Sequence, residues 1–233
     1  MSNYILKIVD DPNKFVDRVP EILGDISHDQ VKHVAADLKD TIQANKDLVA
    51  LCAPQIGQSL RLFCVRFSDN KIKTFLNPMI VKQEGLHLSR EVNASLKDEE
   101  GKLQEYIIPR HNEISVAYQQ TDGRVEVDQF KGILAEVIQQ MVEMLDGILL
   151  SDYGLPVLDG FDKATKEEKE QIITMYLDSL KAEHKGLKAE IESNPELKNI
   201  NDNIEFMKGV ILGDIKPVDK DGNIVEAKSE EKK

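Results

Sequence analysis

Residues 135–150, AEVIQQMVEMLDGILL, constrain the fold more than any other part of the chain. Their apolar side chains recur at the spacing of a helix with a wide buried face. These side chains are Val137, Ile138, Met141, Val142, Leu145 and Ile148. Gly147 predicts the end of this helix, and the apolar run at 148–150 predicts an extended segment after it.

The composition and charge of the chain exclude several classes of protein. Its 233 residues have a formal net charge of −12, which argues against nucleic acid and anionic membranes as partners. No apolar run approaches the length of a membrane span, and the N-terminus lacks the pattern of a signal peptide. Cys52 and Cys64 form neither a disulfide framework nor a CxxC motif. We therefore expect a cytoplasmic protein that carries no cofactor.

Several stretches resemble signatures of the peptide deformylase family, and they occur in the family's order. Residues 48–57, LVALCAPQIG, resemble G-x-G-x-A-A-P-Q-x-G, and the strands expected at 73–81 and 106–118 contain the family's Asn-Pro and Arg-His pairs. Residues 138–149 resemble I-Q-H-E-x-x-H-L-x-G-x-L. The matches in this last stretch are Ile138, Gln139, Leu145, Gly147 and Leu149. The resemblance implies an α+β fold in which short antiparallel strands surround a central helix.

The helix lacks the residues that make the family's motif catalytic. In HExxH, two His one turn apart hold a metal, and the Glu handles protons. In this chain Gln140 and Met144 stand at the His positions and Met141 at the Glu position. An amide oxygen is a weak ligand, and a thioether suits neither the Fe(II) nor the Zn(II) that the family uses.

The family's third metal ligand is the Cys of an E-G-C-L-S motif. Two alignments of residues 89–104 fit this motif, one with Ala94 at the Cys position and the other with Lys102. We prefer Ala94. Neither alignment supplies a thiolate, so we expect no metal, and Gln55 is the one catalytic position of the family that is retained.

The resemblance also indicates which residues line a substrate groove. In the family, the Gln helps to stabilise an oxyanion, glycines lie beside the substrate, and an Arg after the Pro positions the peptide. The corresponding residues here are Gln55, Leu48 and Ala50 in place of the glycines, and Arg110. Because Leu48 and Ala50 add side chains, we expect a narrowed groove.

We expect three regions along the chain. Residues 1–152 resemble the deformylase domain. Residues 153–218 contain two amphipathic stretches, the first opened by a Thr165–Glu168 capping box, and predict a helical hairpin that extends the domain. Residues 219–233 are charged and almost free of large apolar side chains, which predicts a disordered tail.

These observations favour a catalytically inactive, deformylase-like protein with a binding or structural role. We expect it to bind a protein partner or a second copy of itself through the C-terminal helices. Deformylase relatives also occur in phage genomes, so a virion or assembly role is conceivable.

Two alternatives remain open. The first is an atypical deformylase or hydrolase that acts on N-formyl-methionyl peptides. It could use Cys52 paired with either His87 or His111. The stretch around His87 is typical of a polar loop. The second is a peptide-binding module that keeps the groove without the chemistry, although Leu48 and Ala50 count against it.

Overall fold

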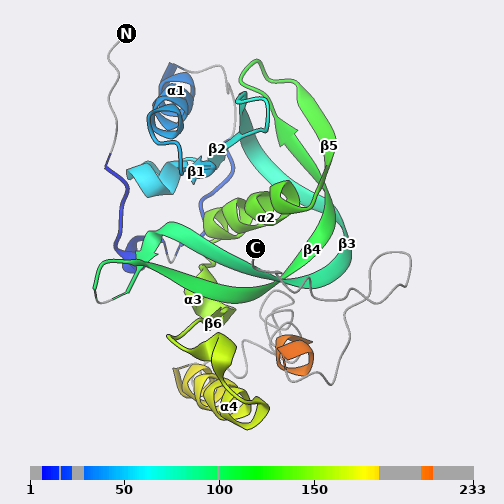
Figure 1. Cartoon of the computed structure of the whole chain (residues 1–233). Coiled ribbons are helices and arrows are strands. Elements are labelled where there is room, and N and C mark those ends of the chain that lie inside the picture. The colour runs from blue at the N-terminus through cyan, green and yellow to red at the C-terminus, as the bar shows by residue number, and fades with distance from the viewer. Residues whose placement is uncertain (1–6, 16, 23–28, 99, 184–205, 212–233) are drawn as a thin grey trace. The chain divides into compact units, whose positions relative to one another are not determined.

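The computed structural model describes residues 7–15, 17–22, 29–98, 100–183 and 206–211 (Figure 1). The chain forms two compact units. The first comprises residues 1–83, 92–104 and 111–149, and the second comprises 84–91, 105–110 and 150–233. The C-terminal part of the chain therefore belongs to one unit with the middle pieces of two strands. No described helix is both long and apolar enough to cross a membrane.

An antiparallel sheet provides the framework. Its strands are β1 (Ala50–Cys52), β2 (Leu62–Arg66), β3 (Ile72–Lys97), β4 (Leu103–Gln119), β5 (Val125–Lys131) and β6 (Leu155–Pro156). The order is β1-β2-β3-β4-β5, and β6 pairs with β4 outside this path. The long strands β3 and β4 each contribute residues to both units.

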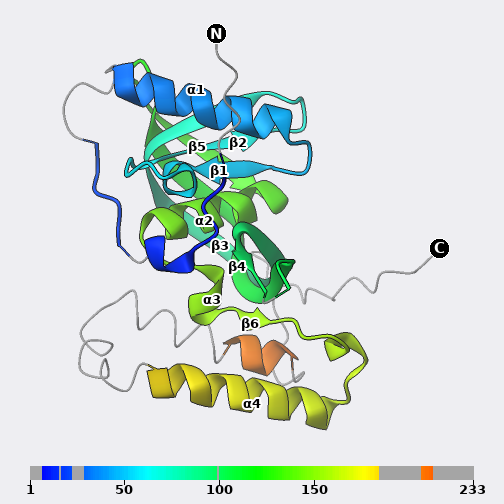
Figure 2. The same ribbon diagram turned by 90° about the vertical axis from the view of Figure 1, so that its left-hand side faces the viewer.

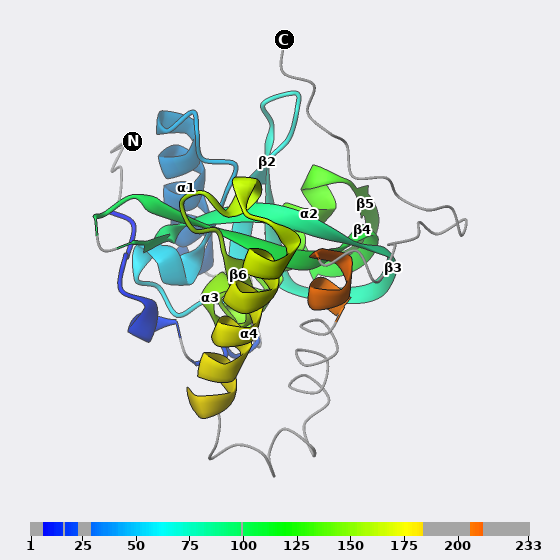
Figure 3. The same cartoon turned by 60° about the horizontal axis from the view of Figure 1, so that its bottom comes forward.

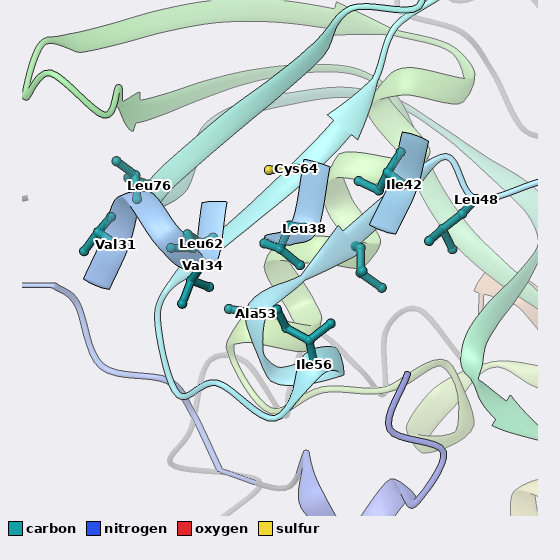
Figure 4. Packing of buried hydrophobic residues seen from close by; sticks show 11 residues of the cluster. Val31, Val34, Leu38, Ile42, Leu48, Ala53, Ile56, Leu62, Cys64 and Leu76 are labelled. Atoms are coloured by element: carbon teal, nitrogen blue, oxygen red, sulfur yellow. The ribbon is translucent and has the colours of Figure 1, made fainter. Parts of the chain in front are cut away.

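In the first unit, helix α1 (Asp29–Ala44) covers one side of β1 and β2, and helix α2 (Ile133–Leu145) lies on the other side (Figure 2). The apolar face of α1 meets alternate residues of the sheet, because side chains along a strand alternate between its two faces. Figure 4 shows this cluster of buried side chains. It contains Val31, Val34, Leu38 and Ile42 from α1 and Leu62, Cys64 and Leu76 from the sheet.

The intervening strand residues carry aromatic rings on the opposite side of the sheet. Phe63 and Phe75 stack with their centroids 4.8 Å apart, and Tyr118 lies 4.5 Å from Phe75. Phe75 also meets Phe130 edge-on at 5.7 Å. This ring cluster joins β2 to β5 through side chains that the backbone alternation turns to one face.

The second unit is built around the pairing of β6 with β4, in which Ile107 lies opposite Leu155. Helix α3 (Leu150–Tyr153) precedes β6, and a short 3-10 turn at Phe161–Lys163 and helix α4 (Lys166–Glu183) follow it. Ile173 of α4 and Met207 are buried in one cluster with the paired strands, and α4 runs beside residues 206–211 (Figure 3). The predicted capping box is present, because Thr165 N–H donates to Glu168 Oε2 at 2.8 Å and Glu168 N–H donates to Thr165 Oγ1 at 3.2 Å.

The structure corrects three predictions. Residues 148–150 do not lead into an extended segment, because Leu150 begins α3. His87 lies within β3 and not in a polar loop, and β3 and β4 have 26 and 17 residues, so these strands are not short. The second predicted helix is described only at 206–211, which is helical, and the tail at 219–233 lies outside the described residues.

Candidate functional site

Three separate elements bring a group of amide side chains together beside α2. Helix α2 supplies Gln140 and Met144, which lie one turn apart on the same face. Strand β3 supplies Asn93, and the 3-10 helix η2 (Ala53–Ile56), which follows β1, supplies Gln55. Gln55, Asn93 and Gln140 are called the amide cluster below.

Asn93 is the centre of the amide cluster. Its Nδ2 donates to Gln140 Oε1 at 2.9 Å and lies 3.7 Å from Met144 Sδ. Its Oδ1 accepts from Gln55 Nε2 at 3.2 Å and from the Ser95 N–H at 2.8 Å. The Asn93 side chain therefore presents its donor nitrogen, which cannot coordinate a cation, toward the two helix residues.

Gln55 is equally occupied. Its Nε2 donates to Ser95 Oγ at 3.2 Å in addition to Asn93, and its Oε1 accepts from the Cys52 N–H at 3.0 Å and the Cys52 thiol at 3.4 Å. An amide has two N–H donors and one oxygen with two lone pairs. Gln55 and Asn93, 1% and 4% exposed, use all of them inside the protein. Neither side chain retains a donor for an oxyanion or a lone pair for a metal.

Two methionines of α2 are buried near Gln140, and one of them, Met144, contacts Asn93 of the cluster. Met141 and Met144 are each 2% exposed, and a flexible thioether side chain fills irregular space that a polar ligand set would leave hydrated. Gln140 is half-buried and donates from Nε2 to the Val92 carbonyl at 3.3 Å. Met144 also borders a hollow of about 270 Å³ that Phe15 and Pro54 help to line.

The residues around α2 do not fit the catalytic metal of a hydrolase. Zinc and iron sites of this kind need His nitrogen, thiolate or carboxylate ligands. The candidate positions instead offer an amide nitrogen from Asn93, an already bonded amide from Gln140 and a thioether from Met144. Within the described part of the chain, no three His, Cys, Asp or Glu side chains lie close enough together to hold a metal ion.

Cys52 does not have the surroundings of a nucleophile. Its side chain is fully buried, and burial raises the pKa of the thiol to about 12. Its thiol hydrogen bond goes to Gln55 and not to a histidine. His111, the other candidate partner, engages Gln139 through its backbone N–H and carbonyl at 2.9 and 2.8 Å. A reactive thiolate needs an electropositive and accessible site, which Cys52 lacks.

The contacts correct the choice of Ala94 for the third metal position. Ala94 packs against the core cluster under α1, whereas its neighbour Asn93 contacts Gln140 and Met144. Side chains alternate between the two faces of a strand, so two neighbouring residues point to opposite faces. Ala94 therefore faces the core and Asn93 faces the amide cluster. With Asn93 in that position, the segment 91–95, EVNAS, aligns with E-G-C-L-S at its Glu and its Ser as well.

The structure also corrects the predicted groove. Leu48 is 9% exposed and belongs to the core under α1, so it does not line an open groove. Ala50 keeps partial exposure in β1. Arg110 is 1% exposed and lies in the second unit, where its Nε and Nη2 bind Glu91 at 2.7 and 2.9 Å and its Nη1 donates to the Tyr153 hydroxyl at 2.9 Å. The Arg110 charge is therefore paired inside the protein and does not face a substrate groove.

The fold, the helix and the η2 segment agree with one family of known proteins. The model of the family described as polypeptide deformylase matches residues 5–157 of the chain. The chain belongs to the polypeptide deformylase family. The family consists of metal-dependent hydrolases.

Individual relatives agree with this assignment. The peptide deformylase of Dictyoglomus thermophilum is 36% identical over 124 residues, which cover 53% of this chain and 76% of that protein. The enzyme of that name from Thermus thermophilus is 32% identical over 154 residues, covering 59% and 78%. The crystal structure of peptide deformylase from Thermotoga maritima superposes with a TM-score of 0.56 at 25% identity, covering 64% of this chain and 97% of that one. The predicted α+β deformylase fold is thus confirmed.

Sequence reasoning missed Asn93 and Ser95 as members of the deformylase site. Both are polar residues in a charged stretch, and such residues are usually exposed. The signal that could have identified them is that Glu91, Asn93 and Ser95 are polar residues at every second position, as on one face of a strand. In the structure all three are buried.

Proposed function

We propose that this chain is a deformylase-fold protein that has lost hydrolysis and performs a binding or structural role. The observation that carries the proposal is the complete use of the Gln55 and Asn93 amides by partners inside the protein. Formamide hydrolysis needs an activated water, which the family obtains from a metal and a Glu. At the Glu position, Met141 has no group that accepts a proton.

The burial of the site supports the same proposal. A site that binds and releases substrate keeps polar groups available, whereas this one is filled by thioethers and satisfied amides. The described part of α4 also directs Ile173, 1% exposed, into the second unit. A partner role for the C-terminal helices remains a proposal, and it would have to use other faces of α4, such as the one with Met175, which is 74% exposed.

Two measurements on the full chain test the proposal. The first is elemental analysis of protein grown with iron, zinc and nickel and purified without a histidine tag. The second is hydrolysis of formyl-Met-Ala-Ser. We expect no stoichiometric metal and no turnover above the rate without protein. Metal-dependent deformylation by the wild-type chain, the activity for which its relatives are named, would overturn the proposal.

A pair of matched variants shows whether the site has been identified correctly. The first combines Gln140→His, Met141→Glu and Met144→His with Asn93→Cys, and the second combines the same three changes with Ala94→Cys. A His₂Cys ligand set should bind about one Zn²⁺ in the first variant and much less in the second. Metal binding by the second variant alone would show that Ala94, and not Asn93, occupies the position of the family's third metal ligand.

A further inference from the structure

The sheet ends at β5, and no other described strand pairs with the outer edge of this strand (Figure 1). Two hydrogen bonds beyond the ends of the β4–β5 ladder fix which residues face outward. Gln120 N–H donates to the Arg124 carbonyl, and Gly132 N–H donates to the Asn112 carbonyl, at 2.8 Å in both cases. In an antiparallel pair, directly bonded positions alternate with positions whose backbone groups point away. The even-numbered residues of β5 therefore bond to β4, and the odd-numbered ones face outward.

The outward-facing residues also expose their side chains. Val125 and Val127 are 67% and 62% exposed, and Gln129 and Lys131 are exposed as well. The outward N–H and C=O groups of these four residues have no backbone hydrogen-bond partner among the described residues. They are called the β5 edge below. It contains no proline, and its two exposed valines lie on one face, so it can accept an added strand.

Charge determines which strand fits the β5 edge. On the other face of β5, Asp128 and Glu126 lie 2.7 and 3.3 Å from Lys73 Nζ, and both carboxylates accept from the Tyr118 hydroxyl at 2.6 Å. Arg124 also acts on Glu126 electrostatically but pairs with Asp122, so three carboxylates face two cationic groups and one negative charge is left in excess. The side chains of Glu126 and Asp128 are 30% and 41% exposed, respectively.

We propose that the β5 edge binds an extended peptide segment of alternating apolar and basic residues, which adds to the sheet as an antiparallel strand. Its apolar residues lie opposite Val125 and Val127, and its basic residues lie opposite Glu126 and Asp128. Strand addition obtains affinity from main-chain hydrogen bonds and specificity from alternate side chains. The proposal does not depend on the loss of hydrolysis, since the β5 edge shares no residue with the amide cluster.

A second copy of this chain fits the edge less well. In a two-fold antiparallel pairing centred on Val127, Glu126 of each copy lies opposite Asp128 of the other. A pairing centred one residue to either side places Glu126 or Asp128 opposite its own copy. Like charges directly opposite each other destabilise a strand pair.

The test uses the acetylated and amidated peptide TVKVKVT with the full chain, and the control peptide is TVEVEVT. Nuclear magnetic resonance hydrogen exchange reports the site. In the free protein, the amides of Val125, Val127 and Gln129 should exchange quickly and those of Glu126 and Asp128 slowly. The basic peptide should protect the three fast amides, and the acidic peptide should bind at least about tenfold more weakly.

Two further comparisons separate strand addition from attraction of a basic peptide to an acidic protein. Val127→Pro removes an outward N–H that the β4 ladder does not use, and should weaken binding at least about tenfold, whereas Val127→Thr should stay within about twofold. In the peptide, N-methylation of the valines should abolish binding, because their N–H groups face β5, and N-methylation of the lysines should not. Equal binding of all forms, or slow exchange at Val125 and Val127 in the free protein, would overturn the proposal.

Discussion

The first unit and the second unit each bury a polar cluster, and the two clusters differ in charge. The amide cluster of the first unit is neutral, and its Gln55 and Asn93 side chains have every donor and acceptor occupied. The second unit instead buries a full ion pair, Arg110 with Glu91, 1% and 9% exposed, together with the Tyr153 hydroxyl. We call this group the ion-pair cluster.

The comparison suggests that charge has been kept where it supports the scaffold and removed where it would support chemistry. A buried ion pair with two-point geometry is held only if both partners stay, because either one alone is an uncompensated charge. A neutral cluster carries no such penalty and can take the volume of a former ligand set. The two clusters should therefore respond differently to the loss of one member.

The largest effect is expected from Glu91→Gln in the ion-pair cluster. This change removes the charge of the carboxylate that binds the buried Arg110 guanidinium at two points, and should lower the free energy of unfolding by about 3–5 kcal/mol. Urea unfolding followed by circular dichroism measures the loss. The control is the double variant Arg110→Met with Glu91→Leu, which removes both charges and should be much less destabilised. A loss below about 1 kcal/mol for Glu91→Gln would mean that the pair contributes little.

A smaller effect is expected from Asn93→Leu in the amide cluster. Leucine has a similar volume but leaves the Ser95 N–H and one Gln55 N–H without an acceptor, so the loss should be about 1–3 kcal/mol. Ala94→Ser is the matched control one residue along β3. It breaks no bond of the cluster and should cost less than Asn93→Leu. The reverse ranking of Asn93→Leu and Ala94→Ser would contradict the corrected position of the site.

The clusters also show how far the sequence could predict this molecule. The helix around Gln140 and the capping box at Thr165 follow from local patterns, because periodicity and helix caps act within a few residues. The deformylase fold followed from the resemblance. The choice between Asn93 and Ala94 could not be made from the sequence. These residues lie on opposite faces of β3, and which face is which depends on strand register. The burial of Arg110 depends on Glu91 and Tyr153, 19 and 43 residues away in sequence, so it was equally inaccessible.

Glu126 and Asp128 of β5 extend the comparison to partly exposed charges. Here we expect the smallest effect on the free energy of unfolding. The Tyr118 hydroxyl, followed by Gln120 and Lys73, lowers the pKa of Glu126 to about 2, and Lys73 and Tyr118 lower the pKa of Asp128. A carboxyl whose pKa is lower in the folded state stabilises the protein above its unfolded pKa. This contribution is lost as the pH falls through the folded pKa.

The free energy of unfolding should therefore decline as the pH falls from about 4.5 toward 2, and part of that decline should disappear in Glu126→Gln. Urea unfolding at several pH values measures it, and a carbon-detected titration of the Glu126 carboxyl gives its pKa directly. Glu100→Gln is the matched control, because Glu100 lies in an exposed turn with a single lysine partner, Lys102. An ordinary pKa for Glu126 would mean that the Tyr118 and Lys73 contacts do not persist in solution, and would leave both carboxylates freer to meet a basic strand.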